Sequence, residues 1–148
     1  MIISNDIITD SNELFSKQKD FEALYIASRK KENRLYTDEQ VLQLPGIEPS
    51  HIHYSEWETR KRSVNRLIKY LENKNKPLSI LEIGCGNGWL STRLASINNV
   101  TVLGTDINHT ELSQAKRVFK NKSNLFFEEL NMNHLKAGNK FDMVIFAA

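Results

Sequence analysis

A tight cluster of glycines between an apolar segment and a helical pattern constrains this chain most. Three of its six glycines fall within residues 84–88. The residues before them, 78–83, are mostly apolar and predict a short buried strand, whereas Leu90, Leu94 and Ile97 follow at helical spacing. Glycines in such a turn allow positive φ angles and close approach of the backbone to a ligand. The following helix adds free N–H groups and the positive end of its dipole. The segment therefore predicts a binding loop between a strand and a helix.

The spacing of the glycines narrows the class of ligand. Residues 82–88 have the form E-x-G-x-G-x-G, with Glu82 ahead of Gly84, Gly86 and Gly88. Dinucleotide-binding loops have the spacing G-x-G-x-x-G, and here Trp89 stands where their third glycine would be. The spacing therefore disfavours an oxidoreductase that binds NAD or a nucleotide sugar.

Strands and helices alternate after Pro77. Further strands are expected at residues 100–106, 125–127 and 141–146, with helices between them. Asn108 and Glu111 are placed to cap the helix that follows the second strand. This alternation predicts an α/β fold, a Rossmann-like parallel sheet of about four strands joined by right-handed crossovers.

The second predicted strand ends on an acid, Asp106. In open parallel sheets, ligands bind beyond the carboxyl ends of the strands, and a carboxylate there can accept hydrogen bonds from both hydroxyls of a ribose. An N-terminal cap of the next helix is the alternative role, but Asn108 already provides one. We therefore interpret Asp106 as a ribose-binding candidate and add its neighbour Ile107 to the candidate site.

The first half of the chain is helical in pattern. A polar cluster at residues 10–12 is expected to cap one helix, and Ser55 with Glu58 forms a capping box for a second helix over residues 56–72. The basic face of that second helix is interpreted as solvated surface rather than a polyanion site. We divide the chain into a helical lead-in and cover segment, 1–76, and a binding core, 77–148, within one structural unit.

Composition excludes several classes of protein. The 148 residues, 40% hydrophobic and 26% charged, suffice for a single domain with its own core. A formal charge of +2 gives no basic field for nucleic acid. The single cysteine, Cys85, rules out an internal disulfide framework and a cysteine-based zinc site, and it fits the reducing cytoplasm. Neither a secretory leader nor a membrane span is predicted, and no metal site is expected.

Three segments carry a family resemblance: LEIGCGNGWLS at 81–91, TDIN at 105–108 and FDMVIFAA at 141–148. Together they resemble the class I S-adenosylmethionine-dependent methyltransferases over residues 78–148. The resemblance implies S-adenosylmethionine as cofactor, S-adenosylhomocysteine as product, and a glycine loop lying against the methionine part of the cofactor. It also implies that Asp106 holds the ribose hydroxyls and that Glu82 orders the loop and the amino end of the cofactor.

The same resemblance extends the candidate site to other segments. It places Asn131 where an Asp is usual at the adenine, and Met132 where a backbone N–H meets the ring. An Asn can still accept through its carbonyl oxygen, without the charge, so we expect somewhat reduced affinity for the cofactor. In the lead-in, Tyr54 and Arg60 can reach the cofactor carboxylate, with a surface or capping role as the alternative. The cofactor-binding prediction thus comprises Tyr54, Arg60, Glu82, Gly84, Cys85, Gly86, Gly88, Asp106, Ile107, Asn131 and Met132.

The implied activity is transfer of the sulfonium methyl to an acceptor, expected to be a small molecule, by in-line displacement. No catalytic residue is assigned, and Cys85 is given no nucleophilic role because its place in the loop demands a small side chain. The chain has room for about four strands of the family's seven-stranded sheet and is expected to be truncated after the fourth. The alternative prediction is a non-catalytic cofactor-binding or structural module that self-associates through the open edge of the last strand.

Overall fold

The computed structural model describes residues 6–130 and 140–146 of the chain. Its contacts form two compact units, residues 1–35 and residues 36–148. The first unit contains one helix, α1 (Asp6–Lys31), with three basic residues in its last turn, where they complement the helix dipole. Because α1 begins at Asp6, the polar cluster at residues 10–12 lies within the helix and does not precede it as expected.

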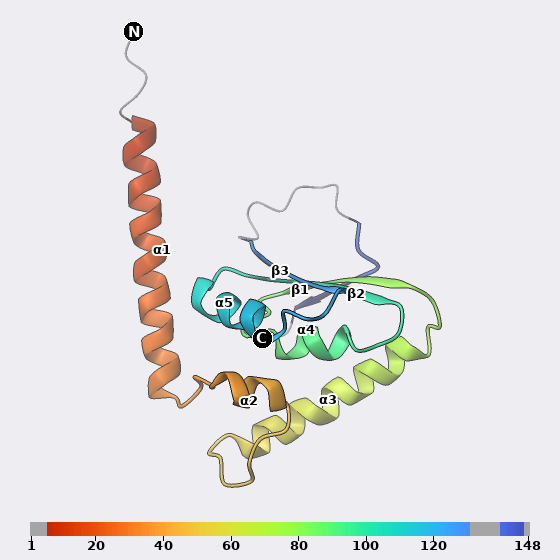
Figure 1. The fold of residues 1–148 in the computed structure, drawn as a ribbon. Helices are drawn as coiled ribbons and strands as arrows, with labels where there is room; N and C mark the ends of the chain where they lie inside the picture. Colours follow the sequence, from red (N-terminus) through yellow and green to blue (C-terminus); the bar gives the residue numbers. More distant parts are fainter. Residues whose placement is uncertain (1–5, 131–139, 147–148) are drawn as a thin grey trace. The chain divides into compact units, whose positions relative to one another are not determined.

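The second unit holds a four-stranded parallel sheet with the strand order β3-β2-β1-β4 (Figure 1). The predicted α/β class, with four parallel strands preceded by helices, is confirmed. The elements of this unit are, in chain order, α2 (Asp38–Gln43), α3 (Tyr54–Glu72), β1 (Leu78–Ile83), α4 (Trp89–Leu94), β2 (Val100–Asp106), α5 (His109–Val118), β3 (Leu125–Glu129) and β4 (Met143–Phe146).

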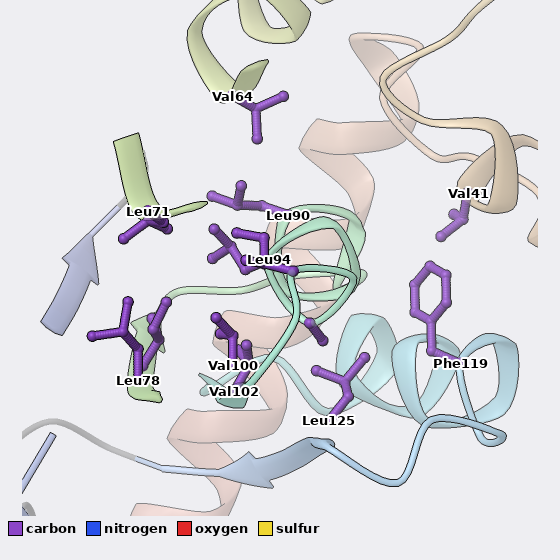
Figure 2. Close-up of a cluster of buried hydrophobic side chains, with 13 residues drawn as sticks. Val41, Val64, Leu71, Leu78, Leu90, Leu94, Val100, Val102, Phe119 and Leu125 are labelled. Atoms are coloured by element: carbon purple, nitrogen blue, oxygen red, sulfur yellow. The ribbon is translucent and has the colours of Figure 1, made fainter. Parts of the chain in front are cut away.

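One face of the sheet carries the main core. The register pairs Ile80 of β1 with Val102 of β2, and Val102 with Leu125 of β3, so these side chains share a face. All three are buried and belong to one apolar cluster with residues of α3 and α4. Figure 2 shows Leu90 and Leu94 of α4 lying over the β2 valines. The helix that follows the glycine loop is thus fixed by its apolar side, which in turn fixes the loop.

Part of the predicted lead-in is built into this unit. The Arg93 guanidinium of α4 donates two hydrogen bonds to the Leu44 carbonyl oxygen, at 3.0 and 2.7 Å. Gln114 of α5 donates to the Tyr36 carbonyl oxygen at 2.8 Å, and Val41 of α2 lies in the apolar cluster. These long-range contacts are why the compact unit begins at Tyr36 and includes the second part of the segment 1–76.

The helix starts in this region differ from the sequence expectation. A capping box does occur, but at Thr37, whose side chain accepts from the Gln40 backbone N–H at the start of α2. The capping box expected at Ser55 is wrong, because α3 begins at Tyr54 with His53 as its N-cap. The backbone turn that precedes α3 already leads into the helix, since the Tyr54 N–H donates to the His51 carbonyl oxygen at 2.9 Å.

The last described strand, β4, lies at one edge of the described sheet. Its start is fixed by Asp142, whose Oδ2 accepts hydrogen bonds from both the backbone N–H and the hydroxyl of Ser79, each at 2.8 Å. Val144 and Phe146 on this strand are more than half exposed. Among the described helices, none combines the length and the apolar character that a bilayer crossing requires.

Candidate functional site

The glycine loop crosses the carboxyl end of β2. Gly84, Gly86 and Gly88 have φ angles of +75°, +52° and +76°, the left-handed region that side chains with a Cβ rarely adopt. The backbone N–H groups of Gly84 and Cys85 both donate to the Thr105 carbonyl oxygen, at 2.8 and 3.0 Å. The loop is therefore held against the strand end that the sequence predicts as the binding edge.

The three glycines face different surroundings. A Cβ added at Gly88 would lie 2.6 Å from Cζ of Phe127, so this side of the loop is packed against the sheet. A Cβ at Gly86 would lie 2.8 Å from Oε2 of Glu111, and a Cβ at Gly84 would meet nothing within 4 Å. We call the surroundings of Gly88 the packed side of the loop and those of Gly84 the open side. The open side leaves space for a ligand next to the backbone of Gly84.

Asp106 joins the loop to the start of α5. Its Oδ2 accepts from the Gly86 backbone N–H at 2.7 Å, and its Oδ1 accepts from the Asn108 backbone N–H at 2.8 Å. Asn108 in turn caps α5, because its Oδ1 accepts from the Glu111 backbone N–H at 3.0 Å, as the sequence predicts. Asp106 is therefore fixed by two backbone donors, and each carboxylate oxygen keeps a further lone pair for hydroxyls of a ligand.

Glu82 has a different environment, although it also stands near a strand end. It is 2% exposed, and its Oε2 accepts a hydrogen bond from the Ser91 hydroxyl of α4. Burial raises the pKa of Glu82 to about 7; the negative charge of Asp106 adds to this shift and the Ser91 hydrogen bond opposes it. Glu82 thus ties β1 to α4, the two elements that the loop connects.

The other loop residue with reactive chemistry is inert here. Cys85 is 4% exposed, and burial raises the pKa of its thiol, with further contributions from the negative charges of Glu82 and Asp106. A nucleophilic cysteine needs a thiolate, which this environment opposes. Cys85 therefore contributes its backbone N–H and its small volume to the loop.

The lead-in approaches the loop through an aromatic contact. Trp89, the first residue of α4, packs edge-on against Trp57 of α3, with ring centroids 5.1 Å apart. Arg60 lies over the Trp57 ring at 5.2 Å and pairs with Glu56 at 2.9 Å. The guanidinium of Arg60 thus lies on Trp57, which packs against Trp89, and its ionic partner in this structure is Glu56. Tyr54 begins α3 and is partly buried.

The remaining candidates divide into described and undescribed residues. Ile107 is 38% exposed and presents an apolar side chain next to Asp106. Asn131, Met132 and Ala147 lie outside the described residues. The sequence reasoning did not single out Ser91 or the position of Glu111 against Gly86, although the Asn108–Glu111 spacing already placed Glu111 in the first turn of α5. Within residues 6–130 and 140–146, no group of three His, Cys, Asp or Glu side chains is arranged to hold a metal ion.

Among residues 6–130 and 140–146, cavities also occur away from the loop. One, of about 250 Å³, is at the amino ends of β1 and β2, where Lys76 and Asn99 line it. The other, of about 210 Å³, is lined by Gly46, Lys61 and Asn65 among others, beside α2, α3 and α4. Because ligands of parallel sheets bind at the carboxyl ends of the strands, we assign neither cavity to the candidate site.

Comparison with known proteins agrees with this geometry. Residues 80–148 match the family model described as a methyltransferase domain. The malonyl-[acyl-carrier protein] O-methyltransferase of Halalkalibacterium halodurans is 25% identical over 99 residues, covering 63% of this chain. The ribosomal protein L11 methyltransferase of Agathobacter rectalis is 35% identical over 51 residues, covering 34% of this chain.

A solved structure shares the fold. The magnesium protoporphyrin IX methyltransferase of Synechocystis PCC 6803, crystallised with bound S-adenosylmethionine, superposes on 74% of this chain with a TM-score of 0.57 and 21% identity. The chain spans 36% and 16% of the lengths of the two curated relatives and 55% of this solved chain. Residues 80–148 of this protein are therefore similar to a methyltransferase domain, and the chain shares the fold of a methyltransferase of known structure.

Proposed function

We propose that the chain binds S-adenosylmethionine at the glycine loop and acts in transfer of its methyl group to a small-molecule acceptor. One observation carries the proposal. The Asp106 carboxylate is fixed by the N–H groups of Gly86 and Asn108, and Gly84, whose N–H donates to the Thr105 carbonyl oxygen next to Asp106, has open space where a Cβ would stand. A carboxylate with free lone pairs next to bare backbone suits a ligand that has both a ribose and a charged tail.

The residues of the site take distinct roles in this proposal. Asp106 accepts hydrogen bonds from the ribose hydroxyls, and the open side of the loop admits the methionine part of the cofactor. Ile107 offers apolar surface to the adenine. Glu82 holds the loop in place through Ser91 and α4. These assignments fit the residues present, because the open side leaves room and the carboxylate keeps acceptor capacity.

When bound, S-adenosylmethionine supplies a methyl group activated by its sulfonium, with S-adenosylhomocysteine as the product. The work left to the protein is to orient the acceptor in line with that methyl group and to exclude water. The aromatic contact between Trp57 and Trp89 provides a rigid apolar support beside the loop for this purpose. We assign no general base, which such a transfer needs only when the acceptor is a weak acid.

The identity of the methyl acceptor is less constrained than the identity of the cofactor. The names of the relatives specify an acyl-carrier-protein derivative, a ribosomal protein and a porphyrin, which belong to three different classes of molecule. We favour a small molecule, because the near-neutral charge balance offers no field for nucleic acid. The single buried thiol suits a reducing compartment such as the cytoplasm.

The decisive experiment is calorimetric titration of the chain with S-adenosylhomocysteine and, in parallel, with NAD. Binding of S-adenosylhomocysteine alone is the expected result. Binding of NAD alone would overturn the proposal, and binding of neither would favour a structural module that self-associates through its sheet edge. The solution mass of the chain would then be measured, and a strict monomer at high concentration would count against that alternative.

Transfer itself needs a second assay. The chain is incubated with methyl-labelled S-adenosylmethionine and a cell extract separated by size into small molecules, proteins and nucleic acids. We expect label in the small-molecule fraction. Label in the protein fraction would mean that the acceptor is a protein and not a small molecule. Binding of the cofactor without any methyl transfer would support the non-catalytic alternative.

A further inference from the structure

One buried side-chain donor next to Asp106 has no acceptor among the described residues. Asn108 is 2% exposed, and its Oδ1 is used by the Glu111 backbone N–H. Its Nδ2 is also buried, and it finds no hydrogen-bond partner in the part of the chain that the structure describes. A primary amide carries two N–H donors, and leaving these donors without hydrogen-bond acceptors inside a protein is unfavourable.

Capping alone does not account for an asparagine at this position. Asp and Ser cap helices about as well as Asn, and neither leaves a buried amide donor unsatisfied. The residue type therefore suggests a second task for the side chain. Since Oδ1 performs the capping, that task belongs to Nδ2.

The contacts of Asn108 place this residue next to the proposed cofactor site. Asn108 donates its backbone N–H to Asp106, and Asp106 accepts from Gly86 of the loop. Gly86 lies against the Glu111 carboxylate, and the Glu111 N–H returns to Asn108. These four residues form a closed ring of contacts that joins the loop, the end of β2 and the start of α5. Asn108, whose Nδ2 donor has no partner among the described residues, is one of these four residues.

The chemistry of a ribose complements this pair of side chains. A hydroxyl has one donor and two acceptor lone pairs, so a hydroxyl that donates to Asp106 still needs a donor. We infer that Asn108 is a positioning residue of the cofactor site, whose Nδ2 group gains its acceptor when the cofactor binds at Asp106. This inference rests on the proposed function, and it assigns a donor to a site in which only an acceptor was recognised.

Two substitutions separate the donor from the cap. Asn108→Ser keeps a capping oxygen and removes the amide, and Asn108→Asp replaces the donor with a carboxylate oxygen. We expect the affinity for S-adenosylhomocysteine, measured by calorimetry, to fall about tenfold in Asn108→Ser and further in Asn108→Asp. The thermal midpoint of the unliganded protein is expected to fall less than in Thr37→Ala, which loses the cap of α2 outright.

Thr37→Ala serves as the matched control, because it removes a helix cap remote from the loop and is expected to bind S-adenosylhomocysteine as the wild type does. If both Asn108 variants bind with wild-type affinity, the inference is overturned while the proposed function stands. If the wild type itself fails to bind S-adenosylhomocysteine, the proposed function fails and the inference falls with it.

A measurement on the wild type covers the case in which the variants do not fold. The side-chain NH₂ resonances of Asn108 are followed by ¹⁵N–¹H NMR during titration with S-adenosylhomocysteine. We expect them to move downfield and to gain protection from solvent exchange, as a donor does when it acquires an acceptor. Resonances that stay in place at saturation would contradict the inference.

Discussion

Two carboxylates stand at neighbouring strand ends of this sheet, and they differ in almost every physical respect. Glu82 of β1 is 2% exposed, is held by a side-chain hydroxyl and has a raised pKa. Asp106 of β2 is partly exposed and is held by two backbone N–H groups. Glu82 joins β1 to Ser91 of α4, whereas Asp106 joins Gly86 of the loop to the start of α5. A strand-end acid can therefore serve the fold or the ligand, and its surroundings decide which.

The largest expected effect is on the free energy of unfolding, and it tests the packed side of the loop. Gly88→Ala places a Cβ against Phe127 at a φ angle of +76°, and we expect a loss of about 2–5 kcal/mol in the free energy of unfolding, combining left-handed strain with overpacking. Urea unfolding measures it. Gly84→Ala is the matched control, because its φ angle is +75° but its Cβ meets nothing within 4 Å, so only about 1–2 kcal/mol is expected. Equal losses in the two variants would remove the distinction between the sides.

The second largest effect concerns the buried acid Glu82 and the pH dependence of stability. The pKa of Glu82 rises from 4.5 to about 7 on folding, so the folded state binds a proton more tightly than the unfolded state. Stability from this group is intact below pH 4.5 and declines as the pH rises to about 7, by up to about 3 kcal/mol. Glu82→Gln removes the decline. Urea unfolding of both proteins from pH 4 to 8 should show a difference that grows in favour of the variant, whereas parallel curves would contradict the burial effect.

The third effect is a change in the affinity for the cofactor when Asp106 is substituted. Asp106→Ala removes charge-assisted acceptors from the proposed ribose site, and we expect cofactor binding to weaken by about 1–3 kcal/mol. Calorimetry with S-adenosylhomocysteine measures the change. Asp142→Ala is the control, because Asp142 also accepts two hydrogen bonds but lies at the opposite end of the sheet, where it fixes β4 to β1. A similar loss of affinity in both variants would indicate a general weakening of the sheet.

The smallest expected effect concerns Ser91, which donates a hydrogen bond to Glu82. Ser91→Ala removes the donor that favours the charged form of Glu82, so the pKa of Glu82 should rise further. The upper end of the pH range over which stability declines is then expected to move upward, with a loss of about 1 kcal/mol at pH 8, where Glu82 is ionised in the wild type. The same pH series of urea unfolding detects the shift. An unchanged range would show that the hydroxyl contributes only packing.

Local patterns in the sequence predicted the sheet and the strand ends at which the candidate site is proposed. β1 and β2 follow from apolar runs that end near an acid, and the cap of α5 follows from the spacing of Asn108 and Glu111. Such features depend on residues close together in the chain. The family resemblance then supplied the expected role of each acid.

The parts that the sequence did not predict depend on long-range contacts. The enclosure of Glu82 depends on Ser91 of α4, and the attachment of residues 36–44 depends on Arg93 reaching the Leu44 carbonyl oxygen. The start of α3 at Tyr54 depends on the backbone turn that precedes it. That the Nδ2 donor of Asn108 has no acceptor among the described residues is known only from the three-dimensional structure.

The edge-on contact of Trp57 with Trp89 has an optical consequence. These are the only two tryptophans of the chain, and Trp89 directly follows the last glycine of the loop. Nearly all of the fluorescence excited at 295 nm therefore originates at the junction between the loop and α3. The chain thus carries a built-in reporter whose emission responds to movement of the loop, without any label attached.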